Sequence, residues 1–156
     1  MEIKFTLNGR AVSAEVGVSD TLYKILRALG VSSVKCGCET TNCGLCTVHM
    51  NGKAVLSCSV PAMRCDGCDI RTLEGMGEAA KTLADCLADE GADQCGFCAP
   101  GLMMNVLMLA KESPYATDEQ ADRYLAGNLC RCTGYMSQKR GIRRFLNKVA
   151  AGEVTV

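Results

Sequence analysis

The sequence predicts an α+β fold in two parts, a small sheet with one helix followed by a group of four short helices. Two hairpin signals indicate the sheet, because alternating runs flank an Asn-Gly turn at Asn8 and a second pair flanks another at Asn51. Apolar residues that recur with helical spacing from Glu78 onward indicate the helical part. We therefore expect two domains, residues 1–75 and residues 76–156.

The expected sheet is built from short strands bounded by turn residues. The strands cover residues 3–7, 10–16, 46–50, 53–60 and 69–75. A helix is expected over residues 19–30, with Ser19 or Asp20 as its N-cap and Gly30 as its stop. The apolar face of this helix is expected to hold Leu22, Ile25, Leu26 and Leu29.

The helices expected in the second half carry recognisable signals at their ends. They cover residues 78–91, 100–113, 118–127 and 137–152. Gly91 ends the first of them, and Pro100 lies at the start of the second. Thr117 and Gln120 have the spacing of a capping box before the third. The fourth has one apolar stripe, formed by Ile142, Phe145, Leu146 and Val149.

Composition narrows the possible functions. The chain has 17 basic and 17 acidic residues, so its zero net charge gives no reason to expect nucleic-acid binding. No secretory signal is visible, and the longest apolar run, within "GLMMNVLMLA", is far shorter than the ~18 residues of a membrane span. We therefore expect a cytoplasmic protein without a membrane span. In that reducing compartment the twelve cysteines indicate metal ligands before disulfides.

The first group of cysteines has the spacing of a plant-type 2Fe-2S site. Cys38 is followed by Cys43 after four residues and by Cys46 after two more, and Cys58 comes eleven residues later. Counting from Cys36 instead leaves a six-residue gap that fits no comparable template. We therefore expect Cys36 to be a bystander, with Cys58 completing the site from the end of the following hairpin.

The second group of cysteines consists of two close pairs. Two residues lie between Cys95 and Cys98, and one residue lies between Cys130 and Cys132. Thirty-one residues separate the first pair from the second. Both pairs lie at helix junctions, where unpaired backbone N–H groups can stabilise thiolates. On spacing alone this set also fits a zinc site.

The motifs "CETTNCGLCTV", "QCGFCAPG" and "GNLCRCTGY", in this order, resemble those of the small iron–sulfur subunit of molybdenum hydroxylases. This is the xanthine dehydrogenase and aldehyde oxidoreductase group, and the resemblance covers essentially the whole chain. It implies an N-terminal plant-type ferredoxin-like β-grasp domain followed by a C-terminal four-helix domain. Each domain would hold one 2Fe-2S cluster.

The resemblance also implies roles for individual residues and for partner subunits. The ligands of the first cluster would be Cys38, Cys43, Cys46 and Cys58. The ligands of the second, which would lie nearer to molybdenum, would be Cys95, Cys98, Cys130 and Cys132. Gln94 would hydrogen-bond the pterin, and Cys132 would lie close to the same ring. Electrons would pass from molybdopterin, in its cytosine dinucleotide form in a large subunit, to FAD in a medium subunit of a hetero-oligomer.

The substrate of such a complex would be handled by the large subunit. The first motif reads "KCGCETTNCGLC" where "GCGEGxCGAC" is commoner in the family, and this difference favours a purine such as xanthine or a related N-heterocycle. Aldehyde, nicotinate, carbon monoxide and aromatic acyl-CoA enzymes remain alternatives. A zinc-stabilised interaction module and a free-standing ferredoxin are the alternatives outside the family.

Four cysteines, Cys36, Cys65, Cys68 and Cys86, fall outside both spacings. They could supply a third centre, but buried free cysteines are also ordinary small hydrophobic residues, and the second interpretation is favoured. His49 is expected to be structural, and a core position is expected for Met103, Met104 and Met108. A solvated helix face, or else a docking patch for an acidic subunit, is expected for Lys139, Arg140, Arg143 and Arg144. No catalytic constellation is present.

Overall fold

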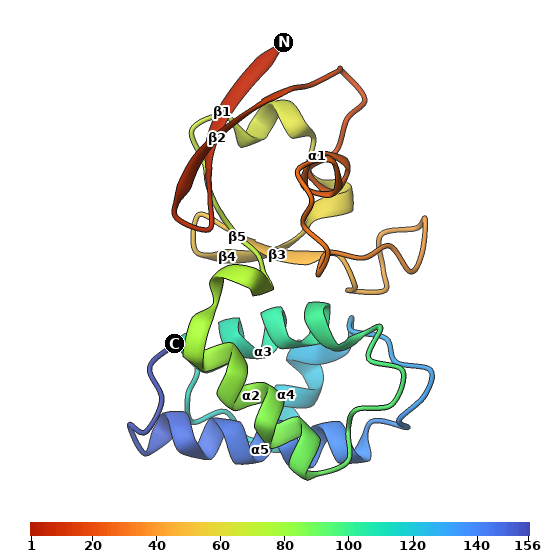
Figure 1. Cartoon of the computed structure of the whole chain (residues 1–156). Helices are drawn as coiled ribbons and strands as arrows, with labels where there is room; N and C mark the ends of the chain where they lie inside the picture. The colour runs from red at the N-terminus through yellow and green to blue at the C-terminus, as the bar shows by residue number, and fades with distance from the viewer.

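A computed structural model describes the whole chain, residues 1–156. Its sheet is formed by β1 (Glu2–Leu7), β2 (Arg10–Glu15), β3 (Thr47–Met50), β4 (Lys53–Leu56) and β5 (Asp69–Arg71). Its helices are α1 (Leu22–Ala28), α2 (Gly77–Asp89), α3 (Ala99–Glu112), α4 (Asp118–Leu125) and α5 (Met136–Ala150). Three short 3-10 helices lie at Ser57–Ser59, Ala62–Cys65 and Leu73–Gly75. The expected α+β fold class is confirmed, with the sheet half above the helical half in Figure 1.

The five strands form one mixed sheet in the order β2-β1-β5-β3-β4. Both predicted hairpins are present, β1 with β2 and β3 with β4. Asn8 and Asn51 have φ values of 51° and 50°, and each is followed by a glycine that also has a positive φ. Two consecutive positive φ values are what a tight two-residue hairpin turn requires. β5 then joins the hairpins, parallel to β1 and antiparallel to β3.

The start and the apolar face of α1 differ from the prediction. Thr21 is the N-cap, and its hydroxyl accepts a hydrogen bond from the backbone N–H of Lys24, so neither Ser19 nor Asp20 caps the helix. Asp20 instead accepts a hydrogen bond from the Lys24 ammonium at 2.6 Å. Leu29 is 39% exposed, because the helix ends at Ala28 and the chain leaves the helical path there.

Two strands end earlier than predicted. β4 stops at Leu56, and the hydroxyl of Ser57 then donates to the carbonyl oxygen of Cys46 at 2.8 Å. β5 stops at Arg71, because the N–H of Thr72 donates to the side-chain oxygen of Asn8 instead of continuing the ladder.

Glu74 joins the end of the sheet half to the loop that leads into the first cysteines. Its carboxylate accepts hydrogen bonds from the hydroxyls of Ser33 and Thr72, both at 2.6 Å. Burial alone would raise the pKa of Glu74, but the hydrogen bonds from Ser33 and Thr72 outweigh burial and lower the pKa to about 2. The ionised carboxylate is therefore the form that the fold stabilises.

The helical half follows the predicted pattern closely. Thr117 and Gln120 form the expected capping box at the start of α4, with both reciprocal hydrogen bonds present. Pro100 lies in the first turn of α3, as predicted. α3 is apolar around most of its circumference, because β3 and β4 lie on one side of it and the other helices on the other (Figure 1). The three methionines of this helix are buried as expected: Met103, Met104 and Met108.

Each half has its own hydrophobic core. The core of the sheet half includes Ile3, Phe5, Leu22, Ile25, Leu26, Val48 and Ile70. The core of the helical half includes Leu83, Leu102, Val106, Leu107, Ile142, Phe145 and Leu146. None of the helices combines the length and the apolar character needed to cross a bilayer.

His49 has the structural role that was expected. It lies on β3, is 6% exposed, and its Nε2 donates to the carbonyl oxygen of Met104 on α3 at 2.7 Å. Burial lowers the pKa of His49, so the neutral ring is favoured. This hydrogen bond ties the sheet half to the helical half.

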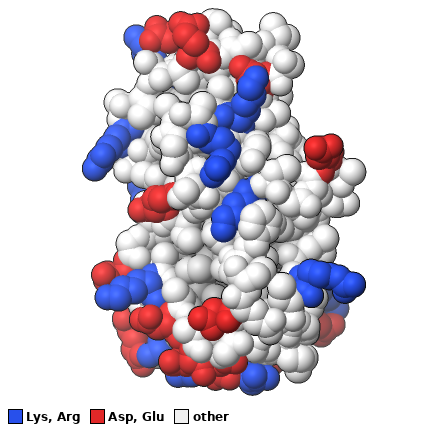
Figure 2. All heavy atoms as spheres, turned by 45° about the vertical axis from the view of Figure 1, so that its right-hand side comes forward, with Lys and Arg blue, Asp and Glu red and all other residues white.

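The basic residues of α5 are paired within the chain. The ion pairs are Lys139 with Asp122, Arg140 with Glu90, Arg143 with Asp118, and Arg144 with Asp89 and Glu90. Figure 2 shows acidic and basic side chains interleaved over the helical half, at the bottom of the view. Because each cation already has an acidic neighbour, this pairing supports the solvated-face interpretation over a docking patch.

Candidate metal centres

The loop between α1 and β3 directs backbone N–H groups at the sulfur of Cys38. Hydrogen bonds from the N–H groups of Asn42, Thr40 and Cys43, together with one from the Cys43 thiol, lower the pKa of Cys38 to about 6. Such donors stabilise a thiolate, and they would also stabilise the negative charge of a bound cluster. The loop is therefore built to hold anionic sulfur.

The four thiols of the first set lie together as two pairs. The thiols of Cys38 and Cys43 are near enough to shift each other's pKa, and the thiol of Cys46 is near enough to raise the pKa of Cys58. Burial is the main cause that raises the pKa of Cys43, and the N–H of Leu45 opposes it. Burial also raises the pKa of Cys58, to about 12, with further contributions from Cys46 and Cys38. The 3-10 turn after β4 thus delivers Cys58 to the other three sulfurs.

Cys36 lies at the edge of this set. It is exposed, and its thiol donates to the carbonyl oxygen of Cys38 at 3.0 Å. The two sulfur pairs thus form without Cys36, whose thiol is engaged by a backbone carbonyl.

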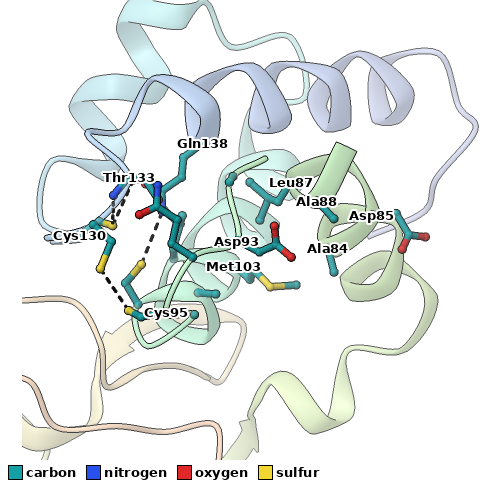
Figure 3. A pocket seen from close by; sticks show the side chains of 17 residues that line it. Ala84, Asp85, Leu87, Ala88, Asp93, Cys95, Met103, Cys130, Thr133 and Gln138 are labelled. Carbon is teal, nitrogen blue, oxygen red and sulfur yellow. Dashed lines mark hydrogen bonds between the residues drawn. The ribbon is translucent and has the colours of Figure 1, made fainter. Parts of the chain in front are cut away.

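The four thiols of the second set also form two pairs, although they come from loops far apart in the sequence. The sulfurs of Cys95 and Cys132 are 3.3 Å apart, and Cys130 is near enough to Cys98 to contribute to the rise of its pKa. Figure 3 shows Cys95 and Cys130 gathered at one end of a cavity. The loop before α3 supplies one member of each pair, and the loop before α5 supplies the other.

Side chains and backbone groups around the second set also point at sulfur. Gln138 of α5, which is only 4% exposed, donates from Nε2 to the sulfur of Cys98 at 3.5 Å. The N–H of Thr133 donates to the sulfur of Cys130 at 3.5 Å, and the Thr133 hydroxyl lies 3.2 Å from the same sulfur. The hydroxyl of Tyr135 accepts a hydrogen bond from the N–H of Cys130 at 2.9 Å and so holds this loop.

These contacts raise the pKa of two cysteines of the second set and lower the pKa of the other two. Burial raises the pKa of Cys98 to about 11. Burial also opposes ionisation of Cys130, but hydrogen bonds from Thr133 outweigh it and lower the pKa to about 7. The N–H of Phe97 lowers the pKa of Cys95, while the hydrogen bond to Cys95 raises that of its pair Cys132.

The paired arrangement fits a two-iron cluster better than a single zinc ion. A structural zinc ion needs four ligands that converge on one point, and no three His, Cys, Asp or Glu side chains converge in this way. A 2Fe-2S cluster is held by four thiolates, two on each iron. All twelve cysteines are free thiols, so both sets are available as donors.

The second set opens into a cavity of about 250 Å³. Gln94 and Cys132, the two residues implied to face a pterin, both line this cavity. The sulfurs lie at one end of the cavity, and Ala84 and Ala88 of α2 lie at the other (Figure 3). The structure therefore brings Gln94 to the same hollow as Cys132.

Three of the cysteines outside both sets are accounted for by packing and local hydrogen bonds. Cys65 belongs to the core of the sheet half, whereas Cys86 belongs to the core of the helical half. The thiol of Cys68 donates to the carbonyl oxygen of Arg64 at 3.4 Å. Because Cys65 and Cys86 belong to different cores, the favoured interpretation of buried thiols holds for them.

Sequence reasoning missed Gln138 and Thr133. The sequence pattern marks Gln138, because this residue lies four positions before Ile142 and so places a polar side chain on the apolar stripe of the last helix. No sequence pattern marks Thr133, because its role depends on how the loop folds around Cys130.

Comparison with known proteins places both halves in described families. Residues 5–84 match the family described as 2Fe-2S iron-sulfur cluster binding domain, and residues 72–143 match the 2Fe-2S binding domain family.

Relatives match over nearly the whole chain. The nicotinate dehydrogenase small FeS subunit of Eubacterium barkeri is 39% identical over 95% of this chain and 96% of its own length. The xanthine dehydrogenase iron-sulfur-binding subunit of Escherichia coli O157:H7 is 45% identical over 85% of this chain and 86% of its own. Quinoline 2-oxidoreductase from Pseudomonas putida 86 contains a chain that superposes with a TM-score of 0.89 at 34% identity, covering 99% of this chain and 98% of that one. The chain thus belongs to the small iron–sulfur subunits of the molybdenum hydroxylase family.

Proposed function

We propose that this chain relays electrons through two 2Fe-2S clusters, one in each of two domains, residues 1–75 and 76–156. The observation that carries the proposal is that eight cysteines lie in two separate sets, each arranged as two sulfur pairs. When bound, each 2Fe-2S cluster takes up and releases a single electron. Two of them in series can therefore carry, one at a time, the two electrons that a hydroxylation leaves behind.

The chain's own residues hold the sulfurs and set the polarity around them. The first cluster would be held by Cys38, Cys43, Cys46 and Cys58, and the second by Cys95, Cys98, Cys130 and Cys132. Hydrogen bonds directed at ligand sulfurs favour the reduced, more negative state and so raise a reduction potential. The N–H groups of Thr40 and Asn42 would act in this way on the first cluster, and Gln138 and Thr133 on the second.

We infer that the cavity beside the second set receives a pterin from a partner subunit. Gln94 and Cys132 line this cavity, and Gln94 is exposed, so its amide is available to a group that docks from outside. The partners would be a large subunit with molybdopterin cytosine dinucleotide and a medium subunit with FAD. The complex would be a cytoplasmic hetero-oligomer in which this chain carries no catalytic residue, and the twelve free thiols support a reducing compartment.

The substrate of the complex is proposed to be a nitrogen heterocycle, with a purine such as xanthine as the first choice. The relatives named for xanthine, nicotinate, nicotine and quinoline all act on such rings by name. A relative named for an aldehyde, the aldehyde oxidase 2 of Rattus norvegicus, is 36% identical, which lies within the range of the relatives named for nitrogen heterocycles. An aldehyde is therefore kept as the second choice, after the nitrogen heterocycle that the first cysteine motif favours.

Purification of the native complex without oxygen tests this proposal. We expect the chain to co-elute with two larger chains, to be red-brown, and to contain about four iron atoms per copy. Elution of a single chain near 16.6 kDa with the same iron content would instead indicate a free-standing ferredoxin. A colourless chain that contains zinc would contradict the redox role altogether.

A further inference from the structure

Asn128 is a buried polar residue that the relay described above does not use. It lies in the turn after α4, is 6% exposed, and comes two residues before Cys130. Its side-chain oxygen accepts a hydrogen bond from Nδ2 of Asn105 on α3 at 2.6 Å. Its Nδ2 donates to the carbonyl oxygen of Gly44, in the loop of the first cysteine set, at 3.3 Å. One side chain therefore joins the helical half to the first cysteine loop.

Beside this side chain, the backbones of the two cysteine loops are directly bonded. The N–H of Leu129 donates to the carbonyl oxygen of Cys43 at 2.9 Å. Cys43 belongs to the first set, and Leu129 is followed at once by Cys130 of the second. A single hydrogen bond thus completes an otherwise covalent path from a sulfur of one set to a sulfur of the other.

The contact between the loops is one of backbone against backbone. Gly44 has a φ of +76°, and a Cβ added to it would lie 2.6 Å from Nδ2 of Asn128 and 2.6 Å from the carbonyl oxygen of Gly127. A Cβ added to Gly101 of α3 would overlap the carbonyl oxygen of Gly44. Two polar bonds span this contact, one from Asn128 to Gly44 and one from Leu129 to Cys43. Asn128 supplies one such bond from a buried position.

We propose that Asn128, held in place by Asn105, is a positioning residue that locks the two cysteine loops together. It keeps the hydrogen bond between Leu129 and Cys43 formed, and so fixes the contact across which an electron passes between the clusters. The electron lost by the second cluster is the electron gained by the first, and Asn128 exchanges neither electron nor proton. This role rests on the proposed relay, because it concerns the link between two loaded sites.

The substitution Asn128→Asp tests the role in the full chain with both clusters loaded. An aspartate keeps the size and the oxygen that accepts from Asn105, but it loses the donor to Gly44 and places negative charge against that carbonyl oxygen. Asn147→Asp is the matched control, because Asn147 is exposed on α5, in the helix rather than in either cysteine loop. Two readouts are followed, the hydrogen exchange of the Leu129 amide and the magnetic interaction between the two reduced clusters in electron paramagnetic resonance.

We expect the Asn128→Asp variant to keep its iron, to exchange the Leu129 amide at least about tenfold faster, and to lose part of the magnetic interaction. The control should match the wild type in both readouts. A loaded Asn128→Asp variant with wild-type exchange and wild-type interaction would overturn the role. If that variant fails to load, Asn105→Ala decides: faster exchange at Leu129 supports the role, and unchanged exchange overturns it. A wild type without clusters would instead contradict the proposed relay, which separates the two failures.

Discussion

At Gly101 the backbone of the helical half comes close to the backbone of the first cysteine loop, and replacing this residue by alanine is a direct test of their packing. Gly101 lies in the first turns of α3 and is buried against the first cysteine loop. An added Cβ would overlap the carbonyl oxygen of Gly44 and would lie 2.8 Å from Cα of Leu45. Both are backbone atoms, so neither can rotate away as the end of a side chain could.

Two opposing effects decide the sign of the change. Alanine is favoured over glycine inside a helix by about 1 kcal/mol. Overpacking a close contact costs about 1–3 kcal/mol, and a clash with rigid backbone belongs at the upper end, near 3 kcal/mol. We therefore expect Gly101→Ala to lower the free energy of unfolding by about 2 kcal/mol, which corresponds to a fall in Tm of about 4–8 °C for a chain of this length.

Circular dichroism during heating gives the Tm, and visible absorption reports whether the clusters remain. Gly127→Ala is the matched control, because Gly127 belongs to the same contact but a Cβ added there meets nothing within 4 Å. We expect this control to change Tm by less than about 2 °C, as a surface substitution would. A Gly101→Ala variant as stable as the wild type would refute the close backbone contact between the halves.

Three further predictions concern single side chains. Cys36→Ser should keep the iron content of the wild type, whereas Cys38→Ser should lose the ferredoxin-type signal; the opposite outcome would make Cys36 the ligand. His49→Phe removes the hydrogen bond to Met104 and should lower the unfolding free energy by about 1–2 kcal/mol in a urea titration, and an unchanged midpoint would contradict its bridging role. The pKa of Glu74 is lowered from 4.5 to about 2. The stabilisation of the fold by its ionised carboxylate is therefore present above pH 4.5 and is lost as pH falls towards 2. Above pH 4.5 we expect Glu74→Gln to be less stable than the wild type by about 1 kcal/mol, as suits a half-exposed group. This difference in unfolding free energy should vanish as pH falls towards 2. A constant difference would show that the carboxylate charge is not its source.

Local chemistry explains which parts of the fold the sequence could predict. The Asn-Gly turns and the capping box of α4 depend on neighbouring residues, and they are present as expected. The N-cap of α1 could not be chosen locally, because Ser19, Asp20 and Thr21 are all good caps. Thr21 is selected because it is paired with Pro61 in an isolated bridge, which holds its backbone extended.

In the candidate centres, too, some features follow from the sequence pattern and others depend on contacts between distant residues. The spacing predicted that Cys58 would join the first set, and the structure brings its thiol against Cys46. The partners of Gln138 and Asn128 could not be predicted, because each bonds to a loop that lies far away in the sequence. Gln138 reaches Cys98 forty positions away, and Asn128 reaches Gly44 eighty-four positions away. The first contact arises only when α5 packs beside α3, and the second only when the helical half packs on the sheet half.

We propose that one chain holds two separate 2Fe-2S clusters on eight of its twelve cysteines. Electron paramagnetic resonance of the fully reduced chain, integrated against its iron content, tests this claim most directly. We expect two distinguishable signals of about one unpaired electron each, with only the signal of the second cluster lost on Cys98→Ser and only the signal of the first cluster lost on Cys58→Ser. A single signal, or the loss of both signals in either variant, would contradict it.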